Sequence, residues 1–99
     1  MIYKQPLPDG KSVQVTFELP SSIWAERVNL VGDFNQWSTD SHEMRQSGAD
    51  GSWRITLELP AGHEYQFRYL INGDDWHNDW HADRYILNRF GTDNSVVAT

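Results

Sequence analysis

Two short segments of this chain combine aromatic and polar side chains in a way that suits ligand binding. The first, residues 32–37, follows the apolar run 28–31 and leads into the polar run 38–41. We expect Phe34 to be buried and Trp37 to be half exposed beside the polar run. A half-exposed indole offers a flat apolar face that can hold the C–H face of a sugar ring. The alternative is that Trp37 only caps the edge of the core.

The second segment, residues 90–94, reads as a loop that leads into a last strand over residues 95–97. A sugar has two features to recognise, its apolar ring C–H groups and its pairs of adjacent hydroxyls. A sugar site therefore needs aromatic platforms with fixed amide, hydroxyl or guanidinium groups between them. The alternative for this segment is a turn in which Asp93 and Asn94 bond their own backbone.

Arg68 is a further candidate because it lies within an alternating run. Tyr65, Phe67, Tyr69 and Ile71 share one parity of this run, and Arg68 has the other. If the first four side chains point into a core, Arg68 points to solvent, where its guanidinium can donate to two hydroxyls. The alternative is an ordinary surface arginine paired with an acidic residue.

The scaffold for these candidates is predicted by an apolar period of two, which indicates strands rather than helices. The alternating runs cover residues 13–19, 53–59 and 65–71, and turn residues separate them. Short strands at this spacing predict an all-β, antiparallel β-sandwich of about seven strands. We expect residues 12–99 to form one domain and residues 1–11 to be a leader or an edge strand.

Several motifs, taken in order, resemble those of one protein family. They are Gly-Asp-Phe-Asn-Gln-Trp (32–37), Tyr-Gln-Phe-Arg-Tyr (65–69), Asn-Gly (72–73), Trp76 and Phe-Gly-Thr-Asp-Asn (90–94). The series is similar to family-48 carbohydrate-binding modules, which include isoamylase-type N-terminal domains and the glycogen-binding domain of AMP-activated protein kinase beta subunits. The resemblance runs from about Val13 to Val97. It implies an immunoglobulin-like sandwich of the early-set type that binds α-1,4-glucan, such as glycogen, starch or maltooligosaccharide, without a cofactor.

The resemblance also implies a role for individual side chains. Trp37 and Trp76 would stack on glucose rings, and Phe90 would pack beside them. Arg68, Thr92 and Asn94 would bond hydroxyls.

The direction of Trp76 depends on the length of the preceding loop, where this chain has one residue more than the kinase-type module. A two-residue loop at residues 72–73 would pair Trp76 with Tyr69 and send it into the core. A three-residue loop would place Trp76 opposite Leu70 on the outer face. Trp80 has the same strand parity and is the alternative platform.

Composition excludes several classes of function. The chain has 99 residues and a net charge of −6, with eight Lys and Arg against fourteen acidic residues. This balance argues against nucleic acid and anionic membranes, which need clustered basic residues, and it is compatible with a neutral glucan. Cysteine is absent, so no disulfide or thiol chemistry is expected, and we expect a cytoplasmic location. No apolar run approaches the length of a signal peptide or a membrane span.

The sequence offers two chemical alternatives to binding, a metal site and an enzyme. His77, Asp79 and His81 share one strand face and could form a metal set, but no recognised ligand spacing supports it. We expect Asp79 or Asp83 to anchor a loop through backbone N–H groups instead. No nucleophile or phosphate-loop motif is present, and the chain is too short for a (β/α)₈ barrel, so we expect no enzyme activity.

The other interpretation is a structural or docking module that packs on a glucan-active enzyme or another protein. Such a module has no need for Trp37, Arg68, Phe90 and Asn94 together. It would need a sizeable exposed apolar patch instead.

Overall fold

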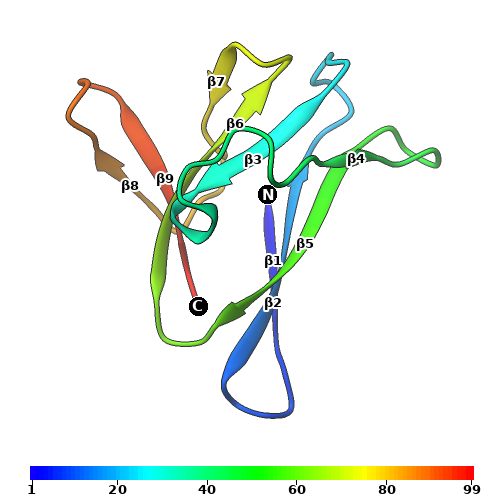
Figure 1. Cartoon of the computed structure of the whole chain (residues 1–99). Coiled ribbons are helices and arrows are strands. Elements are labelled where there is room, and N and C mark those ends of the chain that lie inside the picture. The colour runs from blue at the N-terminus through cyan, green and yellow to red at the C-terminus, as the bar shows by residue number, and fades with distance from the viewer.

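The computed structural model describes residues 1–99, which form nine strands in two antiparallel sheets (Figure 1). Sheet A has the order β1-β2-β5-β4 and sheet B the order β3-β6-β9-β8, with β7 also paired to β6. Sheet A contains β1 (Ile2–Pro6), β2 (Ser12–Leu19), β4 (Arg45–Gln46) and β5 (Trp53–Pro60). Sheet B contains β3 (Val28–Gly32), β6 (Glu64–Ile71), β7 (Asp75–His77), β8 (Arg84–Leu87) and β9 (Asp93–Ala98).

The predicted β-sandwich is confirmed, with more strands than the seven expected. The strands β4 and β7 have only two and three residues, too few to leave an alternating pattern in the sequence. One 3-10 turn, η1 (Asp33–Asn35), follows β3. The chain forms no helix with the length and apolarity needed to cross a membrane.

The core lies between the sheets and is built from one face of each long strand. The inward residues of β2 and β6 are buried: Val13, Val15, Phe17, Leu19, Phe67, Tyr69 and Ile71. The rings of Phe17 and Phe67 meet edge to face at 5.0 Å, and the partly buried Phe34 packs against the same cluster. Because the inward face of β6 is as predicted, Arg68 points to the outer face of sheet B.

The strand β6 changes its partner halfway along one edge. It pairs with β9 over residues 64–67 and with β7 over residues 69–71, so Arg68 lies between the two ladders. On the opposite edge, its pairing with β3 runs without interruption from Phe67 to Ile71. Figure 1 shows β7 and β9 splayed apart.

The chain leaves β3 through a position where only glycine fits. A Cβ atom on Gly32 would lie 2.5 Å from the carbonyl oxygen of Gln66 and 2.7 Å from Cβ of Phe67. The side chain of Asn35 then holds the turn, because it accepts from the Gly32 N–H at 3.1 Å and donates to the Leu30 carbonyl at 3.0 Å. These contacts press the loop after β3 against β6.

Asp79 anchors the segment between β7 and β8 and is only 1% exposed. Its carboxylate accepts the His81 N–H at 2.7 Å and the Tyr69 hydroxyl at 2.6 Å. Asp83 accepts the Ala98 N–H at 2.7 Å. The prediction that Asp79 or Asp83 anchors a loop through backbone N–H groups is confirmed by Asp79, whereas Asp83 bonds the last residue of β9.

The residues considered for a metal site have other partners. Nε2 of His77 lies 2.9 Å from the Asp75 carboxylate, and Asp79 is committed to Tyr69 and the backbone of His81. The two imidazoles and the carboxylate do not gather into a coordination set.

Replacing Gly32 tests the close approach of β3 to β6. We expect Gly32→Ala to lower the free energy of unfolding by about 1–3 kcal/mol, because the new methyl group forces the backbone apart. Gly48→Ala is the matched control, since a Cβ there has nothing within 4 Å, and it should change stability by less than about 0.5 kcal/mol. Urea unfolding measures both, and equal stabilities of the two variants would contradict the packing described here.

Alkaline pH tests the buried Tyr69–Asp79 pair. Burial and the neighbouring carboxylate raise the pKa of Tyr69 well above its usual value of 10.0. The unfolded chain therefore loses this proton near pH 10 while the folded protein keeps it. The stabilisation is complete below about pH 10 and falls at higher pH by up to about 1.4 kcal/mol per pH unit.

Tyr69→Phe lacks this proton, so the stability advantage of the wild type over the variant should shrink above pH 10. Urea unfolding between about pH 8 and 11.5 measures that difference. A difference that stays constant over this range would show that Tyr69 ionises equally in both states.

Candidate functional site

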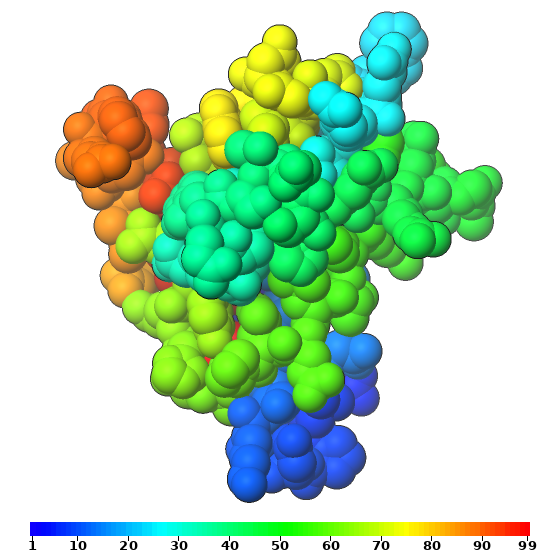
Figure 2. Space-filling view, viewed as in Figure 1, coloured from blue at the N-terminus to red at the C-terminus, as the bar shows by residue number.

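The six residues singled out from the sequence line one groove on the outer face of sheet B. The groove has a volume of about 730 Å³. Its walls are Trp37, Arg68, Trp76, Phe90, Thr92 and Asn94, together with Asp33, Thr39, Gln66, Asn88 and Arg89. Figure 2 shows the hollow between the orange segment near residue 90 and the cyan-green loop that follows β3.

Trp37 is held in the groove wall by a carboxylate. Its indole N–H donates to Oδ1 of Asp33 at 2.8 Å, and Oδ2 of Asp33 accepts the Gln66 N–H of β6 at 2.8 Å. Gln36 and Trp37 have φ values of 54° and 57°, a left-handed geometry that is unfavourable for residues other than glycine. The half-exposed Trp37 therefore faces the groove in a fixed orientation.

The far wall is tied to β6 by side-chain amides. Nδ2 of Asn94 donates to Oε1 of Gln66 at 3.1 Å, and Oδ1 of Asn94 accepts from Nδ2 of Asn88 at 3.1 Å. Asn94 is buried at the groove floor. It keeps one N–H and one lone pair uncommitted, which suits a hydroxyl that both donates and accepts.

Asn88 shapes the loop that carries Phe90 and Thr92. Its Oδ1 accepts the backbone N–H groups of Phe90 at 2.9 Å and Thr92 at 3.2 Å, and its Nδ2 donates to the Thr92 hydroxyl at 2.9 Å. The alternative in which Asp93 and Asn94 bond their own backbone is wrong, because Asn88 performs this role.

Trp76 faces outward because the loop before it has three residues. Ile71 pairs with Asp75 and Leu70 with Trp76, which is the register that a three-residue loop predicts. Trp80 is 68% exposed but does not line the groove. Of the two alternative platforms, Trp76 is the one beside the other candidate residues.

Arg68 lines the groove and has donors without a partner. Its guanidinium carbon lies 6.0 Å from the centre of the Trp76 ring, at the outer limit of a cation–π contact. Its Nε is buried without a hydrogen-bond partner, and it forms no ion pair with an acidic residue. The Nε is shielded, but the side chain as a whole is half-buried, so its terminal guanidinium N–H groups are the donors that an acceptor in the groove could meet.

Five lining residues were not anticipated from the sequence: Asp33, Thr39, Gln66, Asn88 and Arg89. Gln66 shares the strand parity of Arg68, a signal that could have identified it. Arg89 lies over the exposed ring of Phe90 at 5.1 Å, which holds that ring at the rim. The contacts of Asp33 and Asn88 are between distant or irregular segments and leave no sequence pattern.

The groove lining contains one carboxylate rather than a pair. Glycoside hydrolysis uses two carboxyl groups on opposite sides of the scissile bond. The only carboxylate in the lining belongs to Asp33, and both of its oxygens accept hydrogen bonds. Aromatic faces and hydrogen-bonding groups make up most of the rest.

The family described as carbohydrate-binding module 48 (isoamylase N-terminal domain) matches residues 5–86 of this chain. The chain belongs to this family. The match ends before Phe90, so the loop that forms one wall of the groove lies outside the matched range.

The relatives of this module include much longer enzymes. It is 42% identical to the 1,4-alpha-glucan branching enzyme GlgB of Thiobacillus denitrificans over 53 residues. This aligned region covers 50% of this chain and 7% of the enzyme. The module is 39% identical over 59 residues to the branching enzyme of the same name from Shewanella sp. (strain MR-4), covering 56% and 8%. The chain thus spans only a small part of these relatives.

Solved structures with the same fold include two from Shigella flexneri. The module superposes on enterobactin esterase FES with a TM-score of 0.75 and on an enterochelin esterase with a TM-score of 0.72. Each match is 16% identical and covers 98% of this chain and 32% of the esterase. At that identity the likeness concerns the fold alone.

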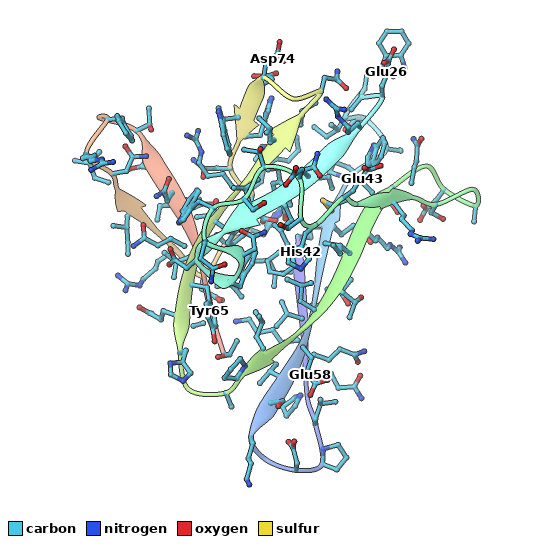
Figure 3. The ribbon with its side chains drawn as sticks, viewed as in Figure 1. Glu26, His42, Glu43, Glu58, Tyr65 and Asp74 are labelled. Carbon is cyan, nitrogen blue, oxygen red and sulfur yellow. The ribbon has the colours of Figure 1, made fainter.

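Removing the Asp33 carboxylate tests how the Trp37 platform is held. We expect Asp33→Ala to lower the free energy of unfolding by about 1–2 kcal/mol through the loss of two charge-assisted hydrogen bonds. It should also speed the exchange of the Trp37 indole N–H with solvent, which NMR can follow. Asp74→Ala is the control, because Asp74 lies at the tip of the β6–β7 hairpin in Figure 3, outside the groove. Equal indole exchange in both variants would contradict the anchoring role of Asp33.

Proposed function

We propose that this module binds α-1,4-linked glucan, such as glycogen, starch or a maltooligosaccharide, in the groove without chemical conversion. The observation that carries the proposal is the meeting of aromatic rings and unsatisfied polar groups in one open depression. Trp37, Trp76 and Phe90 come from three separate segments, and Arg68 lies among them. Family membership supports a carbohydrate ligand, and the proposal adds the kind of carbohydrate.

The two indoles act as platforms for glucose rings. Trp37 is half exposed and oriented by Asp33, and Trp76 is 38% exposed. Such a surface removes the C–H face of a sugar ring from water with little loss of side-chain freedom. Phe90, which is 78% exposed, packs at the rim of the same groove.

The polar groups between the platforms bond the hydroxyls of the sugar. The terminal N–H groups of the half-buried Arg68 guanidinium can donate to hydroxyls, and Asn94 retains one donor and one acceptor. The Thr92 hydroxyl accepts from Asn88 and still has its own proton to donate. A pair of adjacent hydroxyls supplies the matching acceptors and donors.

The groove is open to solvent and its contacts are few, so binding should be weak. We expect a Kd of roughly 10 μM to 1 mM for a short glucan. A polymer presents many sites, and the module would then serve to hold or sense glucan beside a glucan-active enzyme.

A docking role is the second candidate, and exposed apolar residues outside the groove favour it. Trp80 and Leu87 are 68% and 70% exposed, and neither lines the groove. Docking would use these residues, whereas glucan binding uses the groove, so variants of one surface leave the other intact.

Calorimetric titration with maltoheptaose tests the proposed function. We expect saturable binding by the wild type and at least about tenfold weaker binding by Trp37→Ala, because a central aromatic anchor is lost. Arg68→Ala should weaken binding in the same direction.

Trp24→Ala is the matched control, since Trp24 is 98% exposed and lies outside the groove. Cellohexaose is the control sugar and should not compete. Absence of maltoheptaose binding at several millimolar by a folded wild-type protein would refute the proposal and favour docking.

A further inference from the structure

A second depression lies beyond Trp76 on the same face of sheet B. It has a volume of about 310 Å³. Trp76 and Thr39 line both this depression and the groove, so the two hollows adjoin. The lining of the second one combines the polar residues Arg27, Asn29, Asp40 and Glu43 with the apolar residues Leu70 and Trp76.

Asn29 is the most informative residue of this depression. It is only 5% exposed, it lines the hollow, and its side-chain amide forms no hydrogen bond within the protein. It sits opposite Leu70 on β6, and an isolated backbone bridge pairs it with Glu43 on its other side. The buried side-chain atoms without a partner are Nε1 of Trp53 and Nε of Arg68, so the amide atoms of Asn29 open into the depression. They are free to bond a ligand there.

The surrounding charges define the kind of ligand that fits. Asp40 and Glu43 bring two carboxylates, and Arg27 brings the donors of one guanidinium. An anionic ligand would be repelled by the carboxylates, and no group of three acidic or histidine side chains is placed to hold a metal ion. Carboxylate, amide and guanidinium groups together suit a neutral ligand rich in hydroxyls.

We propose that a glucan held in the groove continues past Trp76 into this second depression, where Asn29 and Glu43 bond the hydroxyls of further glucose units. The inference rests on the proposed function, because it assumes that a glucan occupies the groove. It adds that the module selects longer chains over short ones. The glucan then passes over Trp76 between the two hollows.

Chain-length dependence tests this extension. Calorimetry gives the Kd of maltotriose and of maltoheptaose, and we expect the ratio of the two, which is the affinity advantage of maltoheptaose, to exceed about ten for the wild type. In Asn29→Leu this ratio should be about fivefold smaller, because one hydrogen bond to the longer sugar is lost. The stability of Asn29→Leu should be unchanged or higher, because an unpaired amide is replaced by an apolar group of similar size.

Glu43→Ala provides a second test at an exposed position, where folding is not at risk, and should also reduce the advantage of maltoheptaose. Glu58→Ala is its matched control. Figure 3 places Glu43 near β3 and Glu58 far away on β5, toward the β1–β2 hairpin.

The outcomes separate this inference from the proposed function. If the wild type binds both sugars and Trp37→Ala loses both, but Asn29→Leu and Glu43→Ala keep the full advantage of maltoheptaose, the extension is wrong and the groove stands. If the wild type binds neither sugar, both proposals are wrong. A reduced advantage in Asn29→Leu and Glu43→Ala, with Glu58→Ala unchanged, establishes the extension.

Discussion

The carboxylate of Asp33 is the contact on which the groove depends. One oxygen holds the indole of Trp37 and the other holds the backbone of Gln66 on β6. From Gln66, hydrogen bonds continue through its side chain to Asn94 and from there to Asn88, which shapes the opposite wall. The two walls are thus joined across the sheet before any ligand arrives, and a site prepared in this way loses little conformational freedom on binding.

The position of the groove follows from how β6 is paired. Because β9 and β7 take successive halves of one edge, the sheet opens at Arg68, and the neighbouring strands supply groups from two directions. Trp76 comes from β7 and Asn94 from β9. Gly32 packs closely against β6, and this contact brings the loop that carries Trp37 over Arg68.

The sandwich could be predicted because alternation is a local property of a sequence. The six candidate residues came from short motifs and the family resemblance; they line one groove, and their contact with a glucan stays a prediction. The direction of Trp76 could not be predicted, since the sequence allowed loops of two or three residues. The longer loop is held by Asn72, whose side chain accepts the backbone N–H groups of Glu26 at 2.8 Å and Arg27 at 3.2 Å. These donors lie on another segment, as do the partners of Asp33. Contacts of this kind become visible only once the strands are placed.

The five tryptophans offer the most direct measurement of the central claim, that a glucan lies across the outer face of sheet B. In a ¹⁵N NMR titration with maltoheptaose, the indole signals of Trp37 and Trp76 should shift together and saturate. Trp53 is buried in the core, and Trp24 and Trp80 lie outside the groove, so their signals should stay in place. Shifts confined to Trp24 or Trp80, with Trp37 and Trp76 unchanged, would contradict the account.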